Sequence, residues 1–158
     1  MNLTSDFSEL LQSFNDAKVR YLVVGAYAVA YHSDPRFTQD FDVWVEPTAE
    51  NAARVWRALE RFGAPLGGVS RADFAKEEMV YQMGVEPNRI DIIMGIDGVS
   101  FPTAWRNRAS ALLGKIPVQV LGKSDLIRNK RASGRPQDLL DLRRLSNPTK
   151  PRPRTRRK

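Results

Sequence analysis

The chain has 158 residues, of which 42% are hydrophobic and 27% charged, a balance typical of a folded globular protein. It has no cysteine, which excludes disulfides, thiolate zinc sites and a cysteine nucleophile. Its single histidine, His32, is expected to be structural rather than catalytic. The longest apolar run, from Tyr21 to Tyr31, is shorter than the ~18 residues of a membrane-spanning helix, and we see no signal-peptide pattern. We therefore expect a cytoplasmic protein that does not enter a membrane.

The formal net charge of +7 is concentrated at the C-terminal end. Residues 150–158 include six basic side chains and no acidic one, whereas the rest of the chain is close to neutral. This segment is also rich in proline and has no apolar residue to bury, which predicts disorder. We expect a folded domain over residues 1–147 and a basic tail over residues 148–158. The tail either neutralises nucleic-acid phosphates or only keeps the chain soluble.

Helices and strands alternate in the N-terminal part of the chain. Apolar residues at helical spacing follow Ser5, which is the expected N-cap of the first helix. An apolar run that stops at Gly25 is typical of a buried strand. The elements expected here are a helix around residues 7–14, strands at 21–24 and 41–45, and helices at 26–31 and from Thr48 to Gly63.

The C-terminal part continues the mixed pattern. Two strands are expected at 79–85 and 89–96, a helix at 101–108, and one or two short edge strands within 112–121. Ser124 is the expected cap of a helix that Gly134 ends, and Pro136 starts a last helix. Its expected apolar face consists of Leu139, Leu140, Leu142 and Leu145. The order of elements predicts an α/β or α+β domain in which helices flank one mixed sheet.

Two aspartates stand out on the strand at 41–45. Alternation places Phe41, Val43 and Val45 on one face, whereas Asp40 and Asp42 share the other, with Cα atoms roughly 6.6 Å apart. Two carboxylates on one face repel each other unless a cation lies between them. Mg²⁺ prefers such oxygen ligands, and in a two-metal site carboxylates bridge ions about 3.5–4 Å apart. An Asp-x-Asp pair alone is more often a solvated feature of a strand edge.

A third aspartate, Asp91, lies within the apolar run 89–94. A carboxylate in such a strand is costly unless it is paired or bound to a metal. If this strand neighbours the one at 41–45, Asp91 can join Asp40 and Asp42. Upstream, Gly25 and Ala26 stand at a strand-to-helix junction, where small side chains let backbone N–H groups approach a phosphate. A tight turn with close packing is the simpler interpretation of Gly25 alone.

Together these motifs resemble the nucleotidyltransferase superfamily that shares the DNA polymerase β palm. The resemblance rests on the strand 21–24 with Gly25-Ala26, on Arg36-x-Thr38-x-Asp40-x-Asp42, on the later Asp91, and on Lys130 with the run 134–142. It covers roughly residues 18–145, and Ala26 stands where the family pattern has Gly or Ser. The Arg-x-Thr-x-Asp-x-Asp portion is similar to small bacterial members related to AbiEii-type toxins and to antibiotic-modifying transferases.

The resemblance implies a minimal nucleotidyltransferase palm with C-terminal helices. It implies that Asp40, Asp42 and Asp91 are catalytic and hold two Mg²⁺ ions, with Mn²⁺ as a substitute, and that Asp91 is a candidate base. The reaction would transfer an NMP from an NTP to an acceptor hydroxyl and release pyrophosphate. The implied acceptor is RNA, including a tRNA 3′ end, in a toxin–antitoxin or phage-defence setting with an antitoxin protein as partner. The implied nucleotide-binding residues are Gly25, Ala26, Arg36, Lys130, Arg135 and Asp138.

Other interpretations stay open at this point. Arg36 is equally consistent with a surface salt bridge, and Lys130 and Arg135 with a solvated basic helix face. The helix dipole alone explains Asp138 near a helix start. An antibiotic or a protein side chain is an alternative acceptor. The fold is also compatible with a non-catalytic module that binds nucleic acid or a protein, and with a metal-dependent phosphodiesterase.

Overall fold

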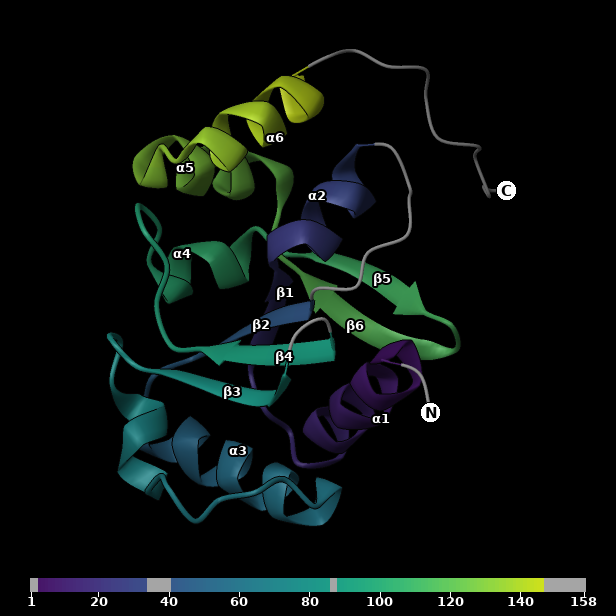
Figure 1. Cartoon of the computed structure of the whole chain (residues 1–158), viewed down its shortest axis with the longest axis vertical. Helices are drawn as coiled ribbons and strands as arrows, with labels where there is room; N and C mark the ends of the chain where they lie inside the picture. The colour runs from purple at the N-terminus through teal and green to yellow at the C-terminus, as the bar shows by residue number, and fades with distance from the viewer. Residues whose placement is uncertain (1–2, 34–40, 86–87, 147–158) are drawn as a thin grey trace.

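A computed structural model describes residues 3–33, 41–85 and 88–146. Within these residues one mixed sheet has helices on both faces, as the sequence predicted (Figure 1). The strand order is β3-β4-β2-β1-β6-β5. The strands are β1 (Tyr21–Val24), β2 (Phe41–Val45), β3 (Val80–Val85), β4 (Asn88–Ile93), β5 (Ala109–Leu113) and β6 (Ile116–Val120).

The helices divide into two layers (Figure 1). One layer covers one face of the sheet with α1 (Leu3–Asp16) and α3 (Ala49–Phe62), followed by a short 3₁₀ helix, η1 (Arg71–Ala75). The other face carries α2 (Gly25–His32), α4 (Phe101–Arg106), α5 (Lys123–Ser133) and α6 (Pro136–Ser146). None of the described helices combines the length and the apolar character that crossing a bilayer requires.

The sheet pairs distant segments directly. Strand β2 runs antiparallel to β1 and parallel to β4, and β6 runs parallel to β1. The hairpin β5–β6 takes the place of the one or two edge strands expected within 112–121, and Gly114 lies in its turn with a positive φ of 64°. The strand expected at 89–96 is shorter, because β4 ends at Ile93.

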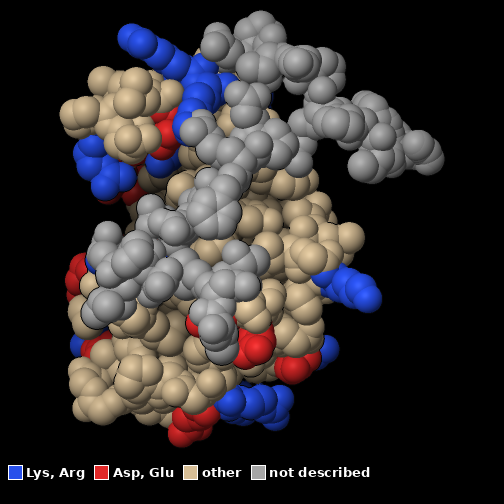
Figure 2. Space-filling model, turned by 45° about the vertical axis from the view of Figure 1, so that its right-hand side comes forward, with Lys and Arg blue, Asp and Glu red and all other residues tan. Residues whose placement is uncertain are grey.

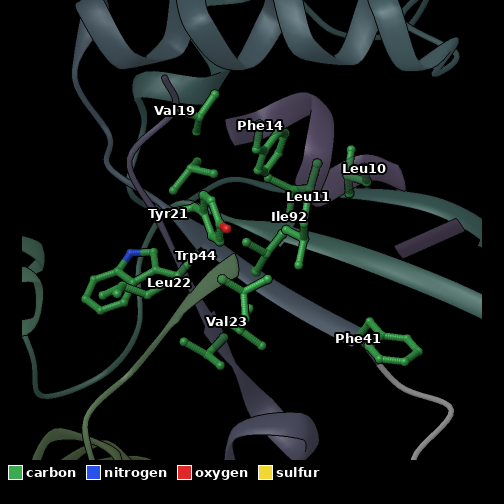
Figure 3. Close-up of a cluster of buried hydrophobic side chains, with 14 of the residues drawn as sticks. Leu10, Leu11, Phe14, Val19, Tyr21, Leu22, Val23, Phe41, Trp44 and Ile92 are labelled. Atoms are coloured by element: carbon green, nitrogen blue, oxygen red, sulfur yellow. The ribbon is translucent and has the colours of Figure 1, made fainter. Parts of the chain in front are cut away.

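The core lies mainly between the sheet and α1. Phe7, Leu10, Leu11 and Phe14 of α1 are fully buried, as their helical spacing predicted, and Phe14 packs on Tyr21 with ring centroids 5.6 Å apart. Figure 3 shows this cluster, which draws on side chains from α1, β1, β2 and β4. On the opposite face, Trp44 packs edge-on against Phe101 of α4 at 5.0 Å. Each strand face is therefore matched to its own layer of helices.

A buried asparagine ties α3 to the sheet. Asn51 is fully buried, and its Nδ2 donates to the carbonyl oxygens of Arg20 and Glu46, at 3.0 Å each. Its Oδ1 accepts a hydrogen bond from the Arg20 backbone N–H at 2.8 Å. The start of α3 is thereby fixed to the ends of β1 and β2. Thr48 caps α3, and Gly63 ends it with φ of 92°, as expected.

Two expected helix caps were wrong. Helix α1 begins at Leu3, so Ser5 lies inside the helix. Helix α5 begins at Lys123 with Gly122 as its N-cap, and Ser124 lies in its first turn. Gly122 is favoured there because a Cβ would overlap the carbonyl oxygen of Asn107.

The expected apolar face of the last helix was also wrong in part. Leu139 and Leu140 are 55% and 54% exposed, whereas Leu145 is buried. The side of α6 that turns inward instead buries Asp138 and Asp141. These carboxylates are stable there because they pair with Lys130 of α5, which is itself buried. Polar pairing between α5 and α6 thus decides which side of α6 faces the domain.

Candidate active site

Asp42 and Asp91 are neighbours on the sheet. They are register partners on the parallel strands β2 and β4, and adjacent strands lie about 4.8 Å apart. The row continues to Gln82 on β3 and to Val24 on β1. Residues in one row point to one face, so the two carboxylates share the face that α2 covers. The adjacency of the two strands, on which the sequence argument for Asp91 depended, is confirmed.

Gly25 leaves room for the Asp42 carboxylate. It follows β1 as the first residue of α2, with φ of 69°, a region that favours glycine. A Cβ at this position would overlap the Asp42 side chain, with Oδ2 the nearest atom. The Asp42 carboxylate is thus held against the start of α2. The N-cap Val24 offers no side-chain hydrogen bond, so the first backbone N–H groups of α2 suit an anionic group here.

Arg89 is a site residue that the sequence reasoning missed. It stands two residues before Asp91 on the same face of β4, and its Nε donates to Asp91 Oδ1 at 3.0 Å. The Asp91 side chain is 17% exposed and that of Arg89 is 33% exposed. The guanidinium therefore offsets part of the negative charge that Asp42 and Asp91 place together. The i, i+2 spacing of Arg89 and Asp91 on a strand was a signal available in the sequence.

The predicted residues of the C-terminal helices form a cluster of their own. Lys130 Nζ lies 3.3 Å from Asp138 Oδ1 and 3.2 Å from Asp141 Oδ2, and all three side chains are buried. Arg135 is largely exposed, and its Nε donates to Asp138 Oδ2 at 2.9 Å. Ser133 Oγ and the Arg135 backbone N–H also donate to Asp138 Oδ2. The structure brings Lys130, Arg135 and Asp138 together and pairs them with one another.

These contacts control the ionisation of Asp138. Its burial raises the pKa of the carboxyl, but hydrogen bonds from Arg135 and Ser133, with the charge of Lys130, outweigh that effect. The pKa of Asp138 therefore lies well below its ordinary range. The same pairing raises the pKa of the Arg135 guanidinium. Asp138 and Arg135 are therefore both charged at neutral pH.

Other predicted residues have different positions. Ala26 is exposed in the first turn of α2. Asp40, Arg36 and the basic tail lie outside the described residues. His32 Nε2 lies 2.7 Å from the carbonyl oxygen of Leu121, so the ring joins the end of α2 to the end of β6. This contact is what a structural histidine makes.

Two of the three predicted carboxylate ligands are placed where they suit a hard cation. Two carboxylates from adjacent strands converge beside a glycine, and hard divalent cations prefer oxygen ligands. Among the described residues no group of three or more acidic, histidine or cysteine side chains is placed to hold a metal. The third predicted ligand, Asp40, is outside those residues, so Asp42 and Asp91 are the two whose placement can be judged.

The comparisons with known proteins agree with this geometry. Residues 1–146 match the profile of a family described as a nucleotidyltransferase of unknown function, DUF6036. The chain belongs to this nucleotidyltransferase family. The family assignment supports the predicted nucleotidyltransferase fold, whereas no curated protein matches the chain.

Two solved structures resemble this nucleotidyltransferase in fold. The lincomycin-bound lincosamide antibiotic adenylyltransferase LnuA aligns with a TM-score of 0.59 and 16% identity, over 92% of this chain and 97% of that one. A putative nucleotidyltransferase from Thermotoga maritima aligns with a TM-score of 0.52 and 15% identity, over 88% and 91%. At these identities the likeness shows the fold, a mixed α/β nucleotidyltransferase domain, and not the acceptor.

Proposed function

We propose that this nucleotidyltransferase uses Mg²⁺ to transfer an NMP from an NTP to an acceptor hydroxyl. The single observation that carries the proposal is the in-register placement of Asp42 and Asp91 on one face of β2 and β4. Two carboxylates on neighbouring strands repel each other, and the one guanidinium of Arg89 offsets part of their charge, so the pair favours a divalent cation beside it. The family assignment supports nucleotidyl transfer as the reaction.

Asp42, Asp91 and Asp40 are the proposed ligands of two Mg²⁺ ions, which Mn²⁺ can replace. When bound, these ions supply positive charge for the phosphates and lower the pKa of the acceptor hydroxyl. Asp91 of β4 is also the proposed base, because it lies beside Asp42 of β2 on the same face of the sheet. The new bond joins the acceptor oxygen to the α-phosphorus, and the bond to the bridging oxygen of pyrophosphate breaks.

Gly25 and Ala26 are the proposed phosphate contacts at the start of α2. Their small side chains leave the backbone N–H groups open to a phosphate, and the helix dipole favours an anion there. Arg36 is the predicted triphosphate contact, and we add Arg89, whose guanidinium already lies at the carboxylate pair. When a cation binds at Asp91, Arg89 can turn toward a phosphate without leaving its own charge unpaired.

Within the C-terminal cluster, we propose Arg135 as the residue that reaches a phosphate. Its side chain is 72% exposed, whereas Lys130 and Asp138 are buried in their mutual pairing. Lys130 and Asp138 then act by holding α5 and α6 together, so that Arg135 keeps its place. This narrows the nucleotide-binding role expected from the sequence to the one exposed member of the cluster.

RNA is the proposed acceptor. A cluster of cations on α3 and just after α1, with no ion pair to the described part of the chain, supports this choice. Lys18, Arg54, Arg57 and Arg61 line a hollow of about 340 Å³ with Asp16, and none of the four has an ion pair among the described residues. We name these four residues the α3 basic cluster. Arginines gathered on one helix face suit a phosphate backbone.

Basic side chains also occur outside the α3 basic cluster. On the face drawn in Figure 2, basic side chains of the described part form separate groups rather than one continuous area.

The toxin–antitoxin setting, the relation to AbiEii-type toxins and an antitoxin partner remain predictions from the sequence motifs. The proposed transfer reaction does not depend on this setting or on such a partner.

A small-molecule acceptor is the second candidate. The specific observation that favours it is the fold likeness to LnuA, which is an antibiotic adenylyltransferase. A non-catalytic nucleic-acid or protein-binding module remains the alternative to both. The close fit of Gly25 against Asp42 favours catalysis, because a binding module has no need to keep that carboxylate in place.

The test is label transfer from NTPs labelled at either the α- or the γ-phosphate, with Mg²⁺ and total cellular RNA. NMP transfer predicts RNA labelled from the α-phosphate and never from the γ-phosphate. A labelled small-molecule fraction with unlabelled RNA would favour the second candidate. No labelled product from either fraction, with a folded protein, would favour the binding module.

A further inference from the structure

A pocket lies at the other end of β2 and β4 from the carboxylate pair. It has a volume of about 410 Å³, within the ~300–1,000 Å³ range of small-molecule sites. Its walls are the β2–α3 connection with Glu46, the β4–α4 connection, and Glu77 before β3. Because β2 and β4 are parallel neighbours, the pocket opens outside their carboxyl ends, where ligands of open α/β sheets commonly bind.

The pocket is separate from the candidate active site. Glu46 follows Asp42 by four residues, directly after the end of β2, which places their Cα atoms roughly 13 Å apart at the rise of an extended strand. Trp44 lies between them and is packed under Phe101 of α4. The metal and phosphate contacts proposed above do not use any residue of this pocket.

Trp44, one of the residues that line the pocket, has an unsatisfied polar atom. Trp44 is 2% exposed, and its indole Nε1 is the only buried side-chain nitrogen or oxygen of the described residues that lacks a hydrogen-bond partner. Leaving such a donor unpaired is costly, and unpaired buried groups in native proteins usually have a reason. In Figure 3, Trp44 lies at one end of the core cluster, opposite Phe41.

The rest of the lining defines the charge and shape of an occupant. Phe101, Met94 and Pro47 supply apolar surface, whereas the polar side chains include the carboxylates of Glu46 and Glu77. Among the described residues, Glu77 has no ion pair, and the Glu46 carboxylate has one, with Arg20 at 3.9 Å. An apolar wall with two weakly compensated carboxylates favours a cation that carries a ring.

We infer that this pocket binds a small organic cation with an aromatic or heterocyclic ring. The cationic group lies between Glu46 and Glu77, and the ring packs against Phe101 and Met94, next to Trp44. The inference does not depend on nucleotidyl transfer, because the pocket and the carboxylate pair share no residue.

The test is an NMR titration of the full chain with benzamidine, a ring-bearing cation, observed through the indole N–H signals. The chain has three tryptophans, and a Trp44→Phe variant assigns the Trp44 signal. We expect a saturable shift of the Trp44 signal with benzamidine at millimolar concentration, a weaker effect of neutral benzyl alcohol, and none of benzoate. No saturable response of Trp44 to benzamidine, or an equal response to benzoate, would overturn the inference.

A matched pair of variants tests the carboxylates. Glu46→Gln/Glu77→Gln removes both pocket charges, whereas Glu60→Gln/Glu78→Gln removes two charges outside the pocket. We expect benzamidine to bind the first variant about tenfold more weakly or worse, a loss of about 1.4 kcal/mol, and the second as the native chain does. Equal weakening in both variants would mean that general charge, not this pocket, attracts the cation.

Discussion

Gly25 and Asp42 face each other so closely that the glycine cannot be replaced without moving the carboxylate. The Cβ that any other residue would add overlaps the Asp42 side chain, and Gly25 also has a positive φ of 69°. The glycine therefore has a double role. It lets the chain turn from β1 into α2, and it sets the position of a proposed metal ligand.

The first prediction concerns Gly25→Ala. We expect the free energy of unfolding to fall by about 2 kcal/mol or more, and label transfer to fall about 100-fold, because the carboxylate is displaced. Gly114→Ala is the control, since Gly114 has a similar φ of 64° and open space around it. Urea unfolding and initial rates measure both effects. If Gly114→Ala loses as much activity as Gly25→Ala, backbone strain and not the carboxylate contact is responsible.

The second prediction concerns metal binding. Mg²⁺ at about 100 times its Kd should stabilise the native chain by about 2.7 kcal/mol, which raises the Tm by roughly 5–10 °C. Asp42→Asn should abolish this response, whereas Asp97→Asn, at an exposed position, should keep it. Differential scanning fluorimetry with and without MgCl₂ measures the shift. An unchanged response in Asp42→Asn would remove this residue from the metal site.

The third prediction concerns the buried ion cluster of α5 and α6. Lys130→Met leaves Asp138 and Asp141 buried with one cation fewer, and breaking a buried pair in this way costs about 3–5 kcal/mol. Lys123→Met, at an exposed position on the same helix, should cost less than about 0.5 kcal/mol. Chemical denaturation gives both values. A small cost for Lys130→Met would mean that the two carboxylates find other partners.

The fourth prediction is a pH dependence that follows from Asp138. Its pKa in the folded chain lies below the unfolded value of about 3.9. The stability that it contributes is therefore complete above about pH 4 and is lost as the pH falls toward the folded value. Asp138→Asn should be less stable than the native chain at pH 7, and the difference should shrink near pH 3. A constant difference across this range, measured by urea titration, would contradict the assignment.

The fifth prediction concerns RNA. Arg54→Gln/Arg57→Gln/Arg61→Gln should weaken binding of a single-stranded RNA and reduce the slope of log K against log salt by roughly 2. The control variant, Arg71→Gln/Arg106→Gln/Arg131→Gln, removes three exposed arginines elsewhere. Fluorescence anisotropy at several salt concentrations measures the slopes. Equal slopes for the two variants would show that the α3 basic cluster has no special role in RNA binding.

The sheet and the carboxylate pair were predictable from the sequence because both depend on local patterns. Alternation on β2 places Asp42 on the face opposite Val43, and the apolar run around Asp91 identifies a buried strand. The adjacency of these strands was a condition of the sequence argument, and the register of β2 and β4 fulfils it. Short-range periodicity carries this information because side-chain direction on a strand is fixed by the backbone.

The buried face of α6 was not predictable in the same way. Four leucines at near-helical spacing indicated an apolar face, yet Leu139 and Leu140 point into solvent. The contact that decides the orientation joins Asp138 to Lys130, on a different helix. A pattern of apolar residues along one helix cannot predict that charged side chains of two helices will pair and become buried. The role of Asn51 was also missed, because its hydrogen bonds to backbone atoms of Arg20 and Glu46 join different segments of the chain.

The central claim is that the carboxylates on β2 and β4 carry out Mg²⁺-dependent transfer of an NMP. Label transfer from α-labelled NTPs by the native chain, Asp42→Asn and Asp91→Asn tests it most directly, with Asp97→Asn as the control. We predict transfer by the native chain and the control only with Mg²⁺ or Mn²⁺, and at least about a 100-fold loss in the other two variants while both remain folded. Undiminished transfer by folded Asp42→Asn or Asp91→Asn would contradict the account.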